Sequence, residues 1–410
     1  MNAAIGARCA RLCLFVAVLA GIAASVRAQV LPADPIAIAD GRITIAGDVS
    51  ASVGSTDPGF FNYTDYEHSQ LRMMRVNVSA AVKAGEHVSV LGDVLTENLD
   101  SIRPYALYLR VRPWSKRAID IQAGRVPPTF GAFARRSYAA DNPLISYPLA
   151  YQYLTSLRPD SLPATVDELL QRRSFGWLVR YSVGSDVLDH GVPLVSAFRW
   201  DTGVQVHAAT ERVSATASVT TGTLSNPRVK DDNDGRQFAA RVEAKPIAGL
   251  VVGSSFARGA FVTSSAFRSA GVSSSPDDFT QTAFGVDAEY SRDHYLVRLE
   301  TVVSAWRIPF ARQLSMTDAL GAVATAIEGR YKIAPAVYVA ARADHLGFTT
   351  LTGTLTSAPW DAPVSRFEIG AGFSIQRNLL TKVSYQRNSR DGGRLTPLAH
   401  QMAAQIVYWF

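Results

Sequence analysis

Cysteine is almost absent from this chain of 410 residues, which has two, Cys9 and Cys13. Both lie in an N-terminal segment where two arginines precede an apolar run, residues 12–25, and small residues surround Ala28. This pattern predicts a secretory signal peptide, residues 1–28, cleaved after Ala28. An uncleaved anchor is the alternative, but the run is shorter than the about 20 residues that a spanning helix needs. The mature chain is therefore expected to have no cysteine, which excludes disulfides, thiol catalysis and cysteine-bound metals.

Long hydrophobic runs are also missing after residue 28, so no helix is expected to span a membrane. Yet 47% of the residues are hydrophobic, a high share for a chain of short alternating segments. Neither sign of charge dominates: there are 41 Lys and Arg against 35 Asp and Glu, and the signal peptide removes three arginines and no acid. So small an excess of positive charge argues against a nucleic-acid partner.

Segments in which apolar and polar residues alternate fill most of the chain, as in strands with two different faces. Within residues 365–376, Phe367 and Ile369 alternate with Arg366 and Glu368. A slip by one residue would place Arg366 in lipid, at a cost of up to about 2 to 4 kcal/mol in mid-bilayer, so the pattern fixes the register. The same alternation predicts strands at residues 41–52, 69–83, 87–97, 104–113, 117–126, 202–210, 212–222, 235–246, 249–261, 280–291, 293–306, 320–331, 334–346, 365–376, 379–389 and 400–410.

The connections between these segments predict a closed barrel. Short turns, such as residues 245–246 and 377–378, alternate with longer polar loops, such as residues 262–279. This asymmetry is typical of transmembrane β-barrels, in which the short turns are periplasmic. The sequence therefore predicts an all-β fold, a transmembrane antiparallel β-barrel of about 16 strands over residues 41–410, after a short periplasmic leader at residues 29–40. A soluble β-sandwich is the alternative, and it does not explain the unequal connections.

One long segment, residues 127–201, lacks this alternation of strands and connections. Residues 127–201 lack strand periodicity for about 75 residues, which is long for an ordinary connection in a compact domain. We expect them to form a long inward-folded loop that enters the barrel lumen and narrows a pore. Counting residues 174–182 and 193–200 as another hairpin would give about 18 strands. That count would need a very short loop at residues 201–203, which favours 16.

The last strand carries a resemblance to a known family. Residues 401–410 alternate and end in Phe410, and they resemble the closing strand of bacterial outer-membrane porins. The resemblance implies that the barrel-insertion machinery recognises Tyr408 and Phe410, that the protein lies among the lipids of the bacterial outer membrane, and that it forms a homotrimer. Residues 123–131 are similar to the entrance of the inward loop in phosphate-selective-type porins, although Thr129 separates the prolines from Phe-Gly.

Charged residues at the inward positions of the predicted strands balance in sign, and many are expected to pair as ladders along the wall. The residues expected at the pore constriction are Arg75, Arg110, Arg112, Arg135, Arg136, Asp141, Arg158 and Asp160. One hypothesis is that Arg110 and Arg112, with the Arg135–Arg136 pair, form a basic eyelet with mild anion preference. The alternative is that the arginines of the loop pair with Asp141 and Asp160 and only anchor it.

These features predict an outer-membrane porin through which small hydrophilic solutes or ions diffuse passively. A ligand-specific channel, or a receptor without a plug, stays open as an alternative, because tyrosines gather in the inserted loop. A barrel enzyme such as a lipid hydrolase would need a nucleophile and a histidine base together. The seven histidines include no metal-binding pair at helical spacing, and the mature chain has no Gly-x-Ser-x-Gly. Neither catalysis nor a cofactor or metal is therefore expected.

Overall fold

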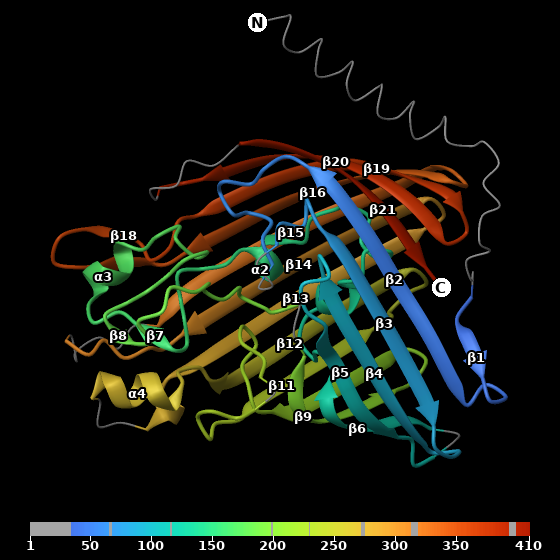
Figure 1. The fold of residues 1–410 in the computed structure, drawn as a ribbon, viewed down its shortest axis with the longest axis horizontal. Coiled ribbons are helices and arrows are strands. Elements are labelled where there is room, and N and C mark those ends of the chain that lie inside the picture. The colour runs from blue at the N-terminus through green and yellow to red at the C-terminus, as the bar shows by residue number, and fades with distance from the viewer. Residues whose placement is uncertain are drawn as a thin grey trace, which may run out of the picture. The chain divides into compact units, whose positions relative to one another are not determined.

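The computed structural model describes residues 34–64, 68–114, 117–197, 200–228, 230–271, 275–312, 319–392 and 399–410. These residues form a closed antiparallel β-barrel of sixteen strands, in which β2 pairs with both β3 and β21 and so closes the sheet (Figure 1). The strands of the barrel are β2 (Ile43–Gly54), β3 (Met74–Lys83), β4 (Val88–Glu97), β5 (Arg103–Val111), β6 (Ala118–Val126), β9 (Asp201–Ala209), β10 (Val213–Thr220), β11 (Gln237–Ala244), β12 (Leu250–Ala260), β13 (Thr280–Arg292), β14 (Tyr295–Trp306), β15 (Leu320–Ala334), β16 (Val337–Phe348), β19 (Val364–Gln376), β20 (Leu379–Arg390) and β21 (His400–Trp409).

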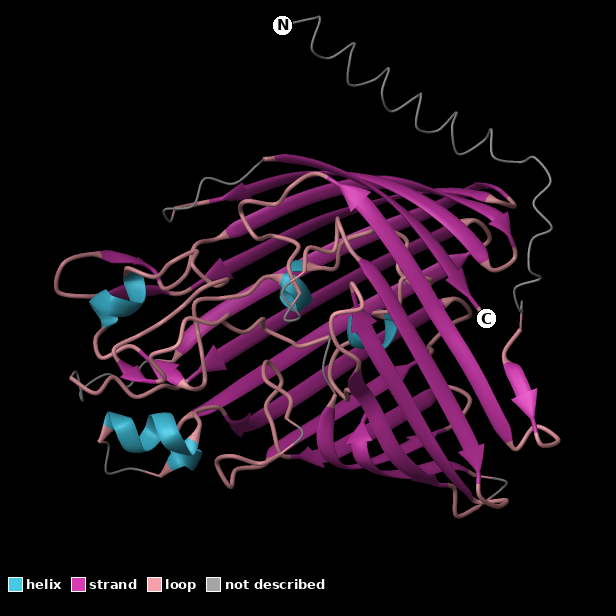
Figure 2. Ribbon diagram, in the orientation of Figure 1, coloured by secondary structure: helices cyan, strands magenta, loops and turns pink. Residues whose placement is uncertain are grey.

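Smaller elements lie outside the barrel strands, and Figure 2 shows the few helices among them. In the described part of the chain, no helix is long and apolar enough to cross a membrane. The predicted signal peptide, residues 1–28, lies outside the described residues. The smaller elements are β1 (Ile36–Ile38), η1 (Phe133–Arg136), α2 (Leu149–Gln152), β7 (Ser161–Leu162), α3 (Val166–Leu170), β8 (Val183–Gly184), α4 (Ser264–Ala270), η2 (Pro276–Asp278), β17 (Thr350–Thr352) and β18 (Ser357–Pro359).

The strand count agrees with the prediction of 16 rather than 18. Each predicted strand overlaps an observed strand. β6 and β9 are direct neighbours, paired from Ala118–Ala209 to Val126–Asp201, so no further hairpin fits between them. Within the described part of residues 127–200, the only strands are β7 and β8, which pair with each other outside the barrel sheet.

The two faces of the wall differ as the alternation predicts. Phe367 and Ile369 on β19 are 47% and 48% exposed, whereas Arg366 and Glu368 between them are 2% and 0% exposed. The exposed apolar side chains of such strands form an outer surface that suits lipid, and the polar side chains face the lumen. The predicted register of this strand is therefore confirmed.

The two ends of the barrel also differ. At one end, short turns join β15 to β16 and β19 to β20. At the other end, long connections carry α3, α4 and the β17–β18 hairpin, which gather on one side of Figure 1. We call these the short-turn end and the long-loop end. The asymmetry matches the prediction from sequence, in which the short-turn end is periplasmic.

Candidate pore constriction

The loop of residues 127–201 leaves β6 at the long-loop end and turns onto the inner wall. Thr129 Oγ1 donates a hydrogen bond to Ser218 Oγ on β10 (2.9 Å), and the Gly131 amide donates to Ser255 Oγ on β12 (3.1 Å). The Phe130 ring lies against Gly285 of β13, where a Cβ would come within 2.9 Å of the ring. Glycine at this inward position therefore makes room for the loop.

The next segment of the loop contacts the other side of the barrel. The Ala132 amide still donates to Glu300 on β14 (2.7 Å), but Tyr138 OH donates to Asp93 on β4 (3.0 Å), and the Ala140 amide lies 3.3 Å from Asp48 on β2. Because these strands are spread around the closed sheet, the segment of residues 129–147 crosses the lumen. We call it the crossing segment.

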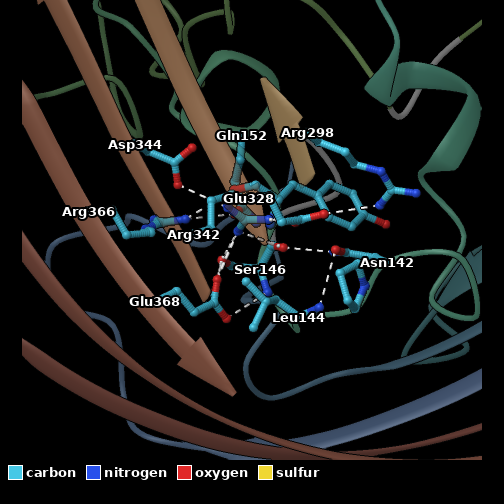
Figure 3. Close-up of polar contacts among 12 residues, drawn as sticks. Asn142, Leu144, Ser146, Gln152, Arg298, Glu328, Arg342, Asp344, Arg366 and Glu368 are labelled. Atoms are coloured by element: carbon cyan, nitrogen blue, oxygen red, sulfur yellow. Dashed lines mark hydrogen bonds and ion pairs between the residues drawn. The ribbon is translucent and has the colours of Figure 1, made fainter. Parts of the chain in front are cut away.

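A buried ionic cluster holds the end of the crossing segment (Figure 3). Arg342 on β16 donates to Ser146 O (2.9 Å) and Ser146 Oγ (2.6 Å), and it pairs with Glu368 on β19 (2.8 Å). The same guanidinium reaches Asp344 (3.0 Å) and Glu328 on β15 (3.2 Å). Charge-assisted hydrogen bonds of this kind are strong, and the loss of one partner leaves a buried charge unpaired.

Lys382 on β20 is a second anchor for the crossing segment. Its Nζ donates to the backbone carbonyls of Ala139 (2.7 Å), Asn142 (2.8 Å) and Leu144 (3.3 Å). An ammonium group has three donors and no acceptor, so these three carbonyls use its full hydrogen-bonding capacity. The ammonium is fixed in place by the backbone of the loop rather than by a carboxylate.

Aromatic side chains fill the space between the crossing segment and the wall. The Phe133 ring lies 5.0 Å from the ring of Tyr147 and 5.1 Å from that of Tyr151. Tyr151 OH donates to Glu300 (2.5 Å). Burial raises the pKa of Tyr151 well above its ordinary value, and the Glu300 carboxylate raises it further. The phenol therefore stays neutral and keeps its role as a donor.

A hydrophobic core continues from these aromatics toward the long-loop end. Leu149 and Leu194 of the loop pack in one buried cluster with Trp306 at the end of β14, Trp360 after β18 and Phe61 after β2. Apolar side chains, rather than a wide aqueous passage, therefore occupy this part of the lumen.

Arginine side chains of the inner wall are more exposed to solvent near the short-turn end. Arg110 and Arg112 share one carboxylate, that of Asp120, at 3.1 Å and 2.9 Å. The two arginine side chains are 34% and 44% exposed, whereas that of Asp120 is 8% exposed. Two cations that share one acid leave an excess of positive charge facing the water of the lumen.

Arg75 and Arg136, two more of the arginines predicted at the constriction, each have an acidic partner. Arg75 pairs with Glu97 (2.7 Å) and donates to Tyr147 OH (2.5 Å), which joins β3 to the crossing segment. Arg136 of the loop pairs with Glu289 on β13 (2.5 Å). Both arginines therefore connect the loop to the wall.

The remaining predicted residues do not join these pairs. Arg158 pairs with Asp160 (2.7 Å) and donates to the carbonyls of Val179 and Val187, all within the loop. The Asp141 carboxylate is exposed and has no hydrogen bond or ion pair to the described residues. The side chain of Arg135 lies outside the described part of the structure. The described contacts thus do not gather the eight predicted residues into one ring.

The strongest anchors of the loop were not among the predicted constriction residues. Arg342, Glu368 and Lys382 were expected on the inner wall from the alternation of their strands, but their contacts with the loop were not. All three bind backbone atoms of residues 139–146, and backbone atoms leave no signal in a sequence. Their inward position was the only available clue.

Asp167 on α3 ties the loop to the β17–β18 hairpin. Its carboxylate accepts hydrogen bonds from the amides of Thr354 (2.9 Å) and Leu355 (3.0 Å). The hydrogen bond from the Thr354 hydroxyl, followed by those from these amides, lowers the pKa of Asp167. The contact is therefore present above the ordinary aspartate pKa of about 3.9 and is lost as the pH falls through the lower folded value.

Acid should therefore expose this part of the loop to protease. Cleavage of residues 127–201 by pepsin is expected to increase as the pH falls below about 3.9, and Asp167→Asn should remove that dependence. Limited proteolysis across this pH range, followed by mass spectrometry of the fragments, measures both effects. Identical pH profiles for the wild type and Asp167→Asn would contradict the assignment.

The C-terminal residues lie at the short-turn end. The amide and carbonyl of Phe410 pair with the carbonyl and amide of Gly47 on β2, each at 3.0 Å. The Tyr408 and Phe410 rings are 6.0 Å apart. Aromatic rings at this level suit the boundary between lipid tails and headgroups.

A closed barrel of sixteen antiparallel strands, with short turns at one end and long loops at the other, is the fold of the outer-membrane porins. No family model and no curated protein matches the sequence. Among solved structures, the chain is similar to a loop L8 deletion mutant of OmpT, an outer membrane protein of Vibrio cholerae (12% identity, TM-score 0.55, covering 90% of this chain and 99% of that one). It is also similar to OmpF of Salmonella typhi (12%, 0.52, 90% and 97%) and to the outer membrane channel DcaP of Acinetobacter baumannii (10%, 0.51, 91% and 99%). At such identities the likeness shows the fold alone.

Proposed function

We propose that the protein is a porin-type channel of the bacterial outer membrane, through which small hydrophilic solutes or ions diffuse passively, and that residues 127–201 narrow its passage. The observation that carries the proposal is the crossing segment, which bonds to inward side chains around the closed barrel. The hydrophobic core beside the long-loop end supports a low conductance, because it leaves little of the cross-section to water.

Recording from the refolded protein in a planar lipid bilayer tests this function. Small stepwise increases in current are the expected result. A barrel that is folded, as judged by a heat-dependent shift in gel mobility, and yet gives no channels would contradict the proposal.

The proposal includes a mild preference for anions. Arg110 and Arg112 support it, because they are half-exposed and share the single carboxylate of Asp120. Fixed charge on the side chains that line a pore influences its ion selectivity. Changing both arginines to glutamine should shift the reversal potential under a salt gradient toward cations. Arg292→Gln, at the exposed last residue of β13 and at the same end of the barrel, is the control and should have little effect. Equal shifts in both would contradict a role for Arg110 and Arg112.

A homotrimer inserted by the barrel-insertion machinery is part of the same proposal. OmpT of Vibrio cholerae has been solved in a trimer form, and the apolar outer surface of the present barrel suits contact with lipid or with a second copy. Tyr408 and Phe410 are the proposed insertion signal. Removing Phe410 should lower the amount of barrel in the outer membrane, measured by fractionation, without changing the amount synthesised.

A channel accounts for the histidines better than an enzyme does. His207 and His345 each lie 2.9 Å from a hydroxyl on the neighbouring strand, Thr216 and Ser365 respectively. A catalytic triad needs a hydroxyl nucleophile, a histidine base and a carboxylate that orients the histidine. Neither histidine ring has a hydrogen bond to a carboxylate among the described residues, so neither pair forms such a triad. Both are ordinary cross-strand pairs.

A further inference from the structure

The outer face of the barrel carries a small polar patch near the long-loop end, on the side of the wall away from the pore. Its side chains project outward, because they alternate with buried inward side chains on the ends of four neighbouring strands, β16, β19, β20 and β21. We call it the outer polar patch, and it consists of His345, Ser365, Tyr385, Arg387, Ser389 and His400.

Strand register places these side chains in three adjacent rows, the third of which holds Tyr385 between Ile369 and Met402. His345, Ser365 and Ser389 are Cα partners in one row. In the next row, Arg387 lies between His400 and the exposed ring of Phe367. Each histidine is held by a hydroxyl through Nδ1, His345 by Ser365 (2.9 Å) and His400 by Tyr385 (2.6 Å). The Nε2 atom of each ring has no hydrogen bond to the described residues.

Arg387 gives the patch its charge. It is exposed and has no hydrogen bond or ion pair to the described residues. None of the outward positions on the four strands holds an aspartate or glutamate. The outward residues become apolar from the row of Tyr385 toward the short-turn end, with Ile369 and Met402 beside Tyr385 and Val383 beyond it. An arginine is costly in hydrocarbon and tolerated near the headgroups, so the patch lies where the apolar band of the barrel ends.

We propose that the outer polar patch binds the phosphate-bearing headgroup of a lipid in the outward-facing leaflet. The guanidinium fork of Arg387 matches two phosphate oxygens, and the histidine rings and serine hydroxyls supply further donors. The proposal rests on the membrane location given under the proposed function, but not on conduction. A second copy of the chain is a poorer fit, because the outward faces of these strands offer no carboxylate to meet Arg387.

Native mass spectrometry of the detergent-solubilised barrel with added phosphatidic acid tests the proposal. Arg387→Gln should weaken binding roughly tenfold, the effect of losing one charge-assisted contact. The matched control is Arg258→Gln, which changes an exposed, outward arginine at the long-loop end of β12 whose Cα partners are Phe238 and Thr282. Its binding should equal that of the wild type.

Four results would overturn the proposal. The first two are equal losses of phosphatidic acid binding in the two variants, and binding of diacylglycerol as strong as that of phosphatidic acid. The other two are displacement of the lipid by an equal concentration of inorganic phosphate, and a change in oligomeric state on Arg387→Gln with lipid binding unchanged. The last two would indicate a free-phosphate site and a contact between copies. Both variants should conduct like the wild type. A barrel that binds the lipid but never conducts would refute the proposed channel and leave this site standing.

Discussion

Replacing residues 127–200 with a two-residue turn should raise the single-channel conductance several-fold and leave the sixteen strands paired. Val126 of β6 and Asp201 of β9 are Cα partners in an antiparallel pair, so an Asn-Gly turn can join these strands as a hairpin without changing their register. The change removes the crossing segment and its aromatic side chains from the lumen. Planar-bilayer recording of the two proteins at one salt concentration measures the effect.

Shortening a different connection provides the control. The β17–β18 hairpin, Thr350–Pro359, lies at the same end of the barrel and pairs only with itself in the sheet topology. Its replacement by a short turn should change the conductance far less than loss of residues 127–200. An unchanged conductance after loss of the loop, in a barrel that still shows its heat-dependent mobility shift, would contradict a constriction by these residues.

Arg342→Met should destabilise the folded barrel by about 3 to 5 kcal/mol, the range for breaking a buried ion pair by removing one partner. The Arg342 side chain is fully buried and pairs with Glu328, Asp344 and Glu368. Methionine fills much of the volume but removes one partner from each of three carboxylates. It also removes the Arg342 hydrogen bonds to Ser146 and leaves Ser146 bonded only to Glu368 in this cluster. The free energy of unfolding in detergent, from urea titration, measures the loss.

Two further variants show whether the loss comes from unpaired charge. Arg112→Met removes a more exposed arginine and should cost no more than about 1 kcal/mol, as for surface ion pairs. Adding Glu368→Gln to Arg342→Met should recover part of the lost stability, because it removes one unpaired charge. Equal losses for Arg342→Met and Arg112→Met would show that the ionic cluster does not hold the loop.

The barrel could be predicted from the sequence because the alternation of apolar and polar residues within each strand shows which side chains face lipid and which face the lumen. Residues 365–376 were predicted as a strand, and Val364–Gln376 is the strand observed. Lipid on one face and a polar lumen on the other select opposite residue types at successive positions, so the period of two is strong. The described residues between Val126, the last residue of β6, and Asp201, the first residue of β9, form no strand of the barrel.

The contacts of the loop could not be predicted in this way. Its path has no period, and several of its anchors are backbone groups, such as the three carbonyls that bind Lys382. The arginines chosen from the sequence illustrate the limit. Arg110 and Arg112 both pair with Asp120 on the neighbouring strand, as expected for charged residues at inward positions of adjacent strands. For Arg342, the sequence predicted an inward position on the wall but no contact with the loop. Long-range pairs such as Arg342 with Ser146 depend on the three-dimensional path of the loop.

The most direct test of the central claim is a cross-link between the loop and the inner wall. Thr129 Oγ1 and Ser218 Oγ are 2.9 Å apart, so cysteines at these positions can form a disulfide, and the mature chain is expected to offer no competing thiol. Thr129→Cys with Ser218→Cys should cross-link on mild oxidation in the folded barrel, giving a shift in gel mobility that reducing agent reverses. Thr129→Cys with Ala217→Cys is the control, because Ala217 is the exposed, outward neighbour of Ser218. Cross-linking of the first pair alone is the predicted result; no cross-link at Ser218, or equal cross-linking at Ala217, would contradict a loop that lies inside the lumen.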